Sequence, residues 1–384
     1  MRILLATTIA FTSLAATTFA AEVTLKKNPQ SVKATIGDDV FAVFQFDEKR
    51  NKPFVLPVTA PGGFELLKAA KSSDEPGAAG RRVIIADEAP RLKEGTHDFK
   101  VGDLIEVGKI EGDWLLIPEH NLWIHRSDVA PVASTVTRQV NDNPPKIKDR
   151  NDPLYYDHPH HKGIWLSVDE INGIKFWNEN GIIENKSIEV IKSTGNPAVI
   201  KTVNHWNDAD GKPLLKEETT IKIYANRLMT YDVTLSAPEQ EVEIGDTKEG
   251  MFAIRLPNSM REMVAGGPVT NADGAEGTGA AWGRTSNWVD YKGPVDGHVF
   301  GVTLMDHPAN KWKSRYHVRN YGLFAVNPFG AGAYTKGRDD QSDPHHQVLK
   351  PNGEKLHFKY GIYIHGGETN KDDIEKVYQQ FSTN

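Results

Sequence analysis

Histidines gather in one short segment of the sequence, where their spacing indicates a chemical site. Three of the protein's 14 histidines, His158, His160 and His161, fall within four positions and follow the carboxylate of Asp157. Imidazole donates, accepts or carries a proton near neutral pH and also binds metals. Such a cluster is costly in a hydrophobic core and unnecessary on a surface, so the segment predicts a functional site.

Two other parts of the chain place charged side chains within apolar runs. Glu249 and Arg255 lie in one apolar segment, where an arginine pairs with a carboxylate or holds a polar ligand. His317 and Arg319 alternate along an extended segment and therefore point to the same face of it. Both segments are candidates for the polar wall of a binding site.

A third polar group directly follows an expected strand and contains Asp306, His307 and Asn310. Tryptophans are frequent around the three groups. Aromatic faces beside such donors and acceptors suit a sugar, because the apolar faces of a pyranose stack on rings while its hydroxyls need polar partners. The tryptophans concerned are Trp165, Trp177, Trp282, Trp288 and Trp312.

These groups lead to an acid–base hypothesis. We expect His160 or His161 to act as acid or base, with Asp306 or Glu249 as the partner carboxylate. The expected catalytic residues are His160, His161, Asp306, His317 and Glu249. The expected substrate-binding residues are His158, Arg255, Arg319, Asn310, His307 and Trp165.

The same residue types also raise the question of a metal. The sequence contains no cysteine, which excludes thiolate metal sites and cysteine nucleophiles. It also lacks a His-Glu-x-x-His motif, so we predict no metal ligand and no cofactor. A divalent metal held by ligands from several strands stays open as an alternative.

The elements that position these residues are expected to be strands. Short alternating runs bounded by Gly, Asn, Asp and Pro predict them, most clearly over residues 39–46, 219–225, 228–235, 298–304 and 356–364. Helical spacing of apolar residues predicts a C-terminal helix over 370–381 and a short helix over 64–71. Many strands and few helices predict an all-β sandwich or barrel.

The first residues and the overall charge bear on location and partners. A positive start, an apolar run and a small-x-small site ending at Ala20 predict a signal peptide over residues 1–20. We therefore expect export to the periplasm or the extracellular space, without membrane insertion. The net charge of −6 without a basic block argues against nucleic acid as a partner.

An inserted unit is expected within the larger domain. After a linker at 64–80, residues 81–131 hold five brief strand patterns, and their Gly-Asp-x-Leu-x-Val, Gly-Asp-Trp-Leu-x-Ile and Trp-Ile motifs resemble bacterial SH3-like domains. The strand pattern of residues 21–63 continues at 133–384, so we expect a discontinuous sandwich domain. The small barrel would bind cell wall or a protein ligand, or act as a spacer.

The outer part of the chain resembles a family of exported bacterial proteins. The motifs of Asp157–Trp165, Glu249–Arg255, Asp306–Asn310, His317–Arg319 and Asn327–Gly330 resemble the family called DUF6807, also labelled methane oxygenase PmoA. We regard the oxygenase label as a misnomer, because that subunit is an integral membrane protein and this sequence has no apolar spanning run after its signal. The resemblance implies a large antiparallel β-supersandwich similar to galactose mutarotases, and a role in carbohydrate breakdown.

Three functions remain in competition. The first is an exported carbohydrate-active enzyme, a glycoside hydrolase or lyase, with a histidine acid–base site. On a keto-sugar, a histidine or arginine near the ketone would stabilise the developing enolate. The second is a non-catalytic protein that binds glycans or cell wall, and the third is a metalloenzyme with a histidine site.

Overall fold

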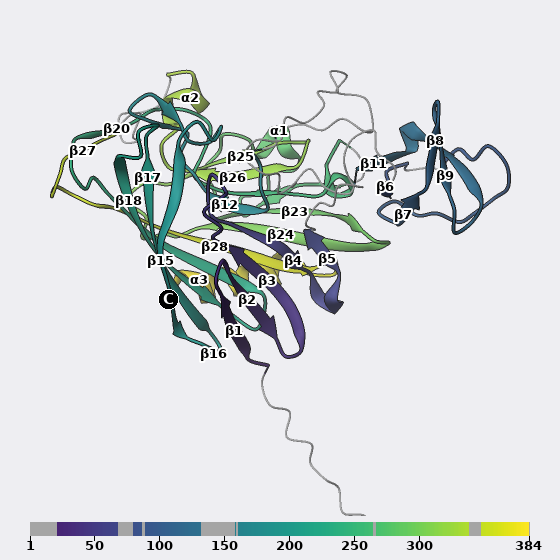
Figure 1. Ribbon diagram of the computed structural model, residues 1–384, viewed down its shortest axis with the longest axis horizontal. Coiled ribbons are helices and arrows are strands. Elements are labelled where there is room, and N and C mark those ends of the chain that lie inside the picture. The colour runs from purple at the N-terminus through teal and green to yellow at the C-terminus, as the bar shows by residue number, and fades with distance from the viewer. Residues whose placement is uncertain are drawn as a thin grey trace, which may run out of the picture.

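The computed structural model describes residues 21–67, 80–86, 89–131, 158, 160–263, 266–337 and 347–383. The predicted signal peptide, most of the predicted linker and Asp157 lie outside these residues. The described chain consists mainly of antiparallel strands (Figure 1). Its helices are α1 (Thr278–Ala281), α2 (Ala331–Thr335) and α3 (Lys371–Ser382), and its 3-10 turns are η1 (Pro61–Gly63), η3 (Arg126–Asp128) and η4 (Asn258–Met260).

Two large sheets dominate the structure. The first, of ten strands, has the order β16 (Thr194–Gly195), β1 (Val23–Asn28), β2 (Ser31–Ile36), β3 (Asp39–Gln45), β4 (Phe54–Thr59), β12 (Ile164–Leu166), β21 (Phe252–Arg255), β26 (Leu323–Asn327) and β25 (Arg315–Val318), with β5 (Glu65–Leu67) beside β4. The second, of eight strands, has the order β15 (Ile182–Lys192), β17 (Ala198–Asn207), β18 (Pro213–Ile223), β19 (Leu228–Ser236), β28 (Leu356–Gly366), β24 (His298–Asp306), β23 (Trp288–Val295) and β22 (Thr270–Asn271).

The two sheets pack face to face around one large hydrophobic core. Phe252 of the first sheet contacts Tyr231 and Tyr360 of the second, with ring centroids 4.6 and 5.9 Å apart. Phe324 meets Tyr291 in the same way at 6.0 Å. Alternate residues of each strand enter this layer, which is the packing that the alternating sequence runs predict. The expectation of an all-β sandwich is therefore confirmed.

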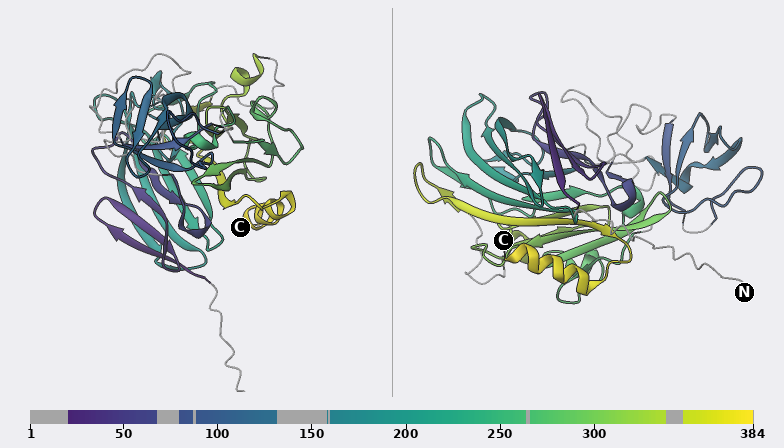
Figure 2. Two further views of the ribbon diagram at one scale, coloured as in Figure 1. Left: turned by 90° about the vertical axis from the view of Figure 1, so that its right-hand side faces the viewer. Right: turned by 90° about the horizontal axis from the view of Figure 1, so that it is seen from below.

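The C-terminal helix covers the outer face of the second sheet (Figure 2). Asn370 caps α3 by accepting a hydrogen bond from the backbone N–H of Asp373 at 3.1 Å. Its apolar residues Ile374, Tyr378 and Phe381 are buried against the sheet. This helix is confirmed, whereas the helix predicted over 64–71 is wrong where the structure describes it: residues 65–67 form β5, which pairs with β4 and belongs to the sandwich.

Smaller sheets lie outside the two large ones. One has the order β14 (Ile174–Lys175), β13 (Glu170–Ile171), β20 (Val242–Ile244) and β27 (Gln347–Leu349). Two three-stranded sheets follow the orders β10 (Leu122–His125), β9 (Trp114–Ile117), β8 (Lys109–Glu111) and β11 (Val129–Pro131), β6 (Gly80–Ile84), β7 (Leu104–Val107).

The two three-stranded sheets form a small β unit that projects from one end of the sandwich (Figure 1). The unit has a hydrophobic cluster of its own, which includes Leu115 and Ile124. It meets the sandwich at the β23–β24 turn, where the backbone N–H of Asp296 donates to the carbonyl of Gly102 at 2.6 Å. None of the helices in the described part of the chain has the length and hydropathy of a membrane span.

Candidate functional site

Four neighbouring strands present predicted site residues on the face of the first sheet that is turned away from the second. In register, Trp165 of β12 lies opposite Ala253 of β21. Ala253 lies opposite Ala325 of β26, which lies opposite His317 of β25. Because Phe252 faces the second sheet, its chain neighbour Ala253 and the whole row lie on the outer face. The two small alanines leave space for larger side chains between Trp165 and His317.

Arg255, two positions after Ala253, joins this outer face to the histidine segment. Its Nη1 lies 3.0 Å from Nδ1 of His161. A guanidinium only donates hydrogen bonds, so Nδ1 accepts and the imidazole proton resides on Nε2. That Nε2 atom is buried and has no hydrogen-bond partner among the described residues. The arginine thus fixes both the orientation and the tautomer of His161.

The histidines form part of an aromatic stack. The ring of His158 lies between those of Tyr321 and His161, with centroid distances of 5.2 and 4.5 Å and planes within 4° of parallel. Trp165 stacks on His161 at 5.3 Å, and His160 meets His161 edge-on at 4.5 Å. His158, His160 and Tyr321 are partly exposed, whereas His161 and Trp165 are buried. An incoming ligand therefore meets His158 and His160 first.

Burial and nearby cations keep two of the histidines neutral. Burial, together with the charges of Lys52, His158 and Arg255, lowers the pKa of His160 to about 2. Burial, with His160 and Arg255 close by, holds the pKa of His161 well below its usual value. At neutral pH both imidazoles therefore act as hydrogen-bond donors and acceptors, and neither carries a charge.

A buried ion-pair network supports the segment from below. Nζ of Lys52 donates to the backbone carbonyl of His160 at 2.7 Å and lies 3.2 Å from Oε1 of Glu179. Nζ of Lys162 lies 2.8 Å from Oε2 of the same glutamate. Lys52 is 1% exposed and Lys162 is 2% exposed, so Glu179 provides the negative charge that two buried ammonium groups require.

A carboxylate and a histidine form the second half of the site. Nδ1 of His317 lies 3.2 Å from Oε2 of Glu249. Burial acts to raise the pKa of Glu249, but the hydrogen bond and charge of His317, with smaller effects of Lys248 and His158, lower it below the usual value. The Glu249 side chain is 25% exposed while that of His317 is 1% exposed. Glu249 is thus an ionised, accessible carboxylate held by a buried imidazole.

The remaining predicted arginine borders the stack. The guanidinium carbon of Arg319 lies 5.5 Å from the centroid of the Tyr321 ring, and that of Arg255 lies 5.2 Å from it. Cations at such distances are attracted to the face of the ring. Arg319 is partly exposed, so the guanidinium is accessible beside Tyr321.

Asp306, His307 and Asn310 do not join this group. Asp306 is fully buried between the sheets, where it accepts hydrogen bonds from Asn310 Nδ2 at 2.8 Å and from Ser314 Oγ at 3.0 Å. Tyr316 points to the same layer, since its hydroxyl donates to the carbonyl of Leu304 at 3.1 Å.

Strand alternation explains the separation. His317 directly follows Tyr316 in β25 and therefore points to the opposite face of the first sheet from Asp306. His307 packs edge-on against Phe381 of α3 at 5.0 Å. The expected pairing of Asp306 with the histidine segment is thus corrected, and Glu249 is the candidate carboxylate that lies near it.

Several residues of the site escaped the sequence reasoning. Lys52 and Glu179 lie far from the histidines in the sequence, in polar stretches that look solvent-exposed. Tyr321 follows Arg319 by two positions, but the two lie in a turn in which the backbone N–H of Gly322 donates to the carbonyl of Arg319 at 3.0 Å, so strand alternation could not place the tyrosine beside the arginine. Within the described ranges no three His, Asp or Glu side chains converge in a way that could hold a metal ion.

No curated protein shows significant sequence similarity to the chain. Similar solved structures include a β-arabinopyranosidase, with 11% identity and a TM-score of 0.28 over 74% of this chain and 40% of that one. The galactose 1-epimerase of Lactobacillus acidophilus NCFM has 10% identity and a TM-score of 0.31 over 90% and 98%. The GalM/aldose epimerase homologue of C. elegans has 10% identity and a TM-score of 0.30 over 90% and 99%.

A family model gives a more direct relationship. It covers the histidine segment, β12, β21, β25 and β26, and so includes all strands that carry the site on the outer face of the first sheet. The small β unit precedes the match almost entirely. Because the model matches residues 129–379, more than half of the chain, the protein belongs to DUF6807, a family of unknown function.

Proposed function

We propose that the protein is a carbohydrate-active enzyme that cleaves glycosidic bonds by proton transfer at the outer-face site. The observation that carries the proposal is the ionised, partly exposed carboxylate of Glu249, which lies 3.2 Å from His317 and close to the histidine segment, where His160 and His161 are neutral. A base with a nearby neutral N–H donor is the minimum needed to move a proton and stabilise the charge that develops.

We propose that the reaction is an elimination, catalysed by a lyase, rather than a hydrolysis. On a sugar that carries a ketone, Glu249 would take the proton from the carbon next to the carbonyl, and the electrons would form an enolate whose oxygen accepts a hydrogen bond from His160. The enolate would then expel the glycosidic oxygen from the neighbouring carbon, and this oxygen would leave with the proton that Glu249 had taken up, which returns Glu249 to its ionised form. No water is consumed, so the products would sum to the mass of the substrate.

Aromatic and charged groups supply the binding surface for such a substrate. His158 and Tyr321 offer flat, partly exposed rings, and Arg319 adds a guanidinium beside Tyr321. A pyranose ring stacks on such faces while its hydroxyls bond to the polar edges. We further propose that the chain is exported after removal of residues 1–20 and that the SH3-like small β unit binds cell wall or a protein partner.

The test is mass spectrometry of a panel of native and 3-keto oligosaccharides after incubation with the protein. We expect cleavage of a keto-glycoside without added water, and a loss of at least about 100-fold in rate for Glu249→Gln. Glu354→Gln provides the matched control, because its carboxylate lies at the exposed surface.

The remaining outcomes decide between the rival functions. Products that have gained one water would support a hydrolase. Binding without cleavage of any panel member would support a glycan-binding protein, and in that case Glu249→Gln would change affinity alone. Activity that disappears with a chelator and returns with a divalent metal would support the metalloenzyme.

A further inference from the structure

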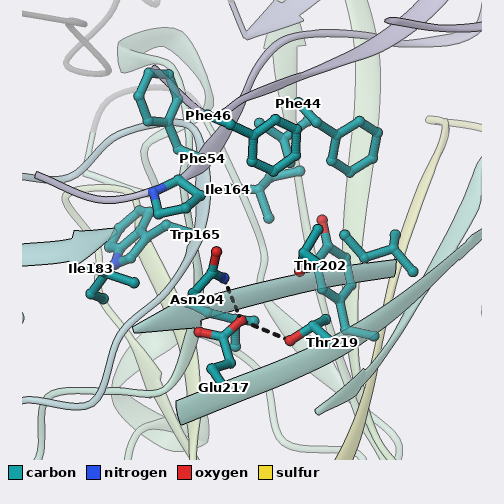
Figure 3. A pocket seen from close by; sticks show the side chains of 15 residues that line it. Phe44, Phe46, Phe54, Ile164, Trp165, Ile183, Thr202, Asn204, Glu217 and Thr219 are labelled. Carbon is teal, nitrogen blue, oxygen red and sulfur yellow. Dashed lines mark hydrogen bonds between the residues drawn. The ribbon is translucent and has the colours of Figure 1, made fainter. Parts of the chain in front are cut away.

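A cleft lies between the two large sheets, and the residues that line it differ from those of the outer-face site (Figure 3). It lies between β3, β4 and β12 of the first sheet and β17, β18 and β19 of the second. Phenyl rings line one side and polar side chains line the other, as Figure 3 shows. The aromatic residues that line the cleft are Phe44, Phe46, Phe54, Trp165 and Tyr231.

One charged side chain lies among the residues that line the cleft, and it is Glu217. The residue is 2% exposed. Its carboxylate accepts hydrogen bonds from Asn204 Nδ2 at 2.9 Å, Trp206 Nε1 at 3.0 Å and Thr219 Oγ1 at 2.7 Å. All three donors are neutral, so they stabilise a carboxylate through hydrogen bonds but supply no positive charge to balance it. A buried carboxylate without a cation is costly, and burial raises the pKa of Glu217 accordingly.

Tyr231 supplies a second unsatisfied group. Its ring lines the cleft, it is 5% exposed, and its hydroxyl is buried without a hydrogen-bond partner among the described residues. Burial and the nearby charge of Glu217 both raise the pKa of the Tyr231 hydroxyl, so the two polar groups lie close together. Buried polar atoms that lack partners mark positions where a ligand or water completes the structure.

We propose that this cleft binds a small organic cation, an alkylated ammonium group that is neutralised by Glu217 and surrounded by the aromatic rings. Aromatic faces attract ammonium ions through their quadrupole, and rings arranged around a carboxylate are a recurrent way of binding methylated or primary amines. A neutral sugar would leave the carboxylate uncompensated, and an anion would be repelled by it. Trp165 borders the cleft and stacks on His161 of the outer-face site, so this one residue links the two sites.

The test is isothermal titration calorimetry of the full chain with choline and with 3,3-dimethylbutan-1-ol, its neutral isostere. We expect choline to bind at least tenfold more tightly than the alcohol. We expect Glu217→Gln to lower choline affinity at least tenfold without changing the affinity for the alcohol, since glutamine keeps the shape and the hydrogen-bonding oxygen of the side chain.

Two further variants keep the result interpretable. Glu218→Gln is the matched control, because Glu218 is the next residue of β18, points to the other face and pairs with Lys216 at the surface. Phe46→Ala removes a partly exposed ring and should lower choline affinity even if Glu217→Gln proves unstable. No binding of choline, equal binding of choline and the alcohol, or unchanged choline affinity in both Glu217→Gln and Phe46→Ala would overturn the proposal.

Discussion

Glu179 provides the sharpest test of how the histidine segment is supported. Its two carboxylate oxygens lie 3.2 Å from Nζ of Lys52 and 2.8 Å from Nζ of Lys162, and both lysines are buried. The substitution Glu179→Gln keeps the shape of the side chain and removes its charge. Two buried ammonium groups then lack their anion, which is the situation in which breaking a buried ion pair is most costly.

The expected cost follows from the two lysines separately. Burial, which outweighs the attraction of Glu179, already lowers the pKa of Lys52 to about 8. Removal of Glu179 takes away the attraction that opposes burial, so the pKa of Lys52 falls further, at a cost of about 1.4 kcal/mol for each pKa unit. Lys162 loses a charge-assisted hydrogen bond that contributes about 1.5–3 kcal/mol. We therefore expect Glu179→Gln to lower the free energy of unfolding by about 3 kcal/mol.

Urea unfolding followed by tryptophan fluorescence measures this change. The matched control is Glu354→Gln, because Glu354 pairs with Lys311 at 2.7 Å but both side chains are more than half exposed. Exposed pairs contribute about 0–1 kcal/mol, so the control should shift the midpoint little. A Glu179→Gln midpoint that matches the control would refute the view that this network supports the histidine segment.

Three further predictions concern the fold. Burial, opposed by hydrogen bonds from Asn310 and Ser314, raises the pKa of Asp306 to about 6. The folded protein then holds this proton more tightly than the unfolded chain. The contribution of Asp306 to the free energy of unfolding is therefore fully present below about pH 3.8, and about 3 kcal/mol of it is lost as the pH rises through 6. Asp306→Asn should remove this part of the pH dependence from urea midpoints measured between pH 4 and 7.5, and an unchanged profile would speak against it. Leu115→Ala, in the core of the small β unit, should destabilise that unit by about 2–5 kcal/mol in calorimetry and leave sandwich unfolding unchanged. Asn370→Ala removes the cap of α3 and should cost about 1 kcal/mol in urea, whereas a loss below about 0.3 kcal/mol would mean that the cap is dispensable.

Much of the fold could be predicted because several of its strands alternate between buried and more exposed residues. From Leu215 in β18 and from Met229 in β19 the buried residues fall at every second position, and the same period is visible in the sequence. The C-terminal helix shows the other period, with Ile374, Tyr378 and Phe381 on one face. The stretch at 65–67 was misassigned because three residues are too few to define a period, and pairing with β4 decides the outcome.

The sequence predicted the kinds of side chain in the site, but only some of the residues that form it. Arg255 contacts the histidine segment, and His317 shares the outer face with it, because β12, β21, β26 and β25 are neighbours in the sheet, an order that differs from their order in the sequence. The predicted role of Asp306 was wrong because its side chain points to the interior of the sandwich. Strand pairing determines which side of a sheet a residue occupies, and the sequence does not show that pairing. Lys52 could not be found, because a buried lysine and a solvated one look alike in a sequence.

The central claim is that Glu249 removes a proton from a keto-sugar at the outer-face site. The most direct measurement is proton NMR of a 3-keto-glycoside in D₂O. It follows the loss of signal from the hydrogen on the carbon next to the ketone as deuterium replaces it. We predict that the wild-type protein catalyses this exchange together with cleavage, and that Glu249→Gln slows both by at least about 100-fold while Glu354→Gln does not. Equal exchange and cleavage by wild type and Glu249→Gln would contradict the account.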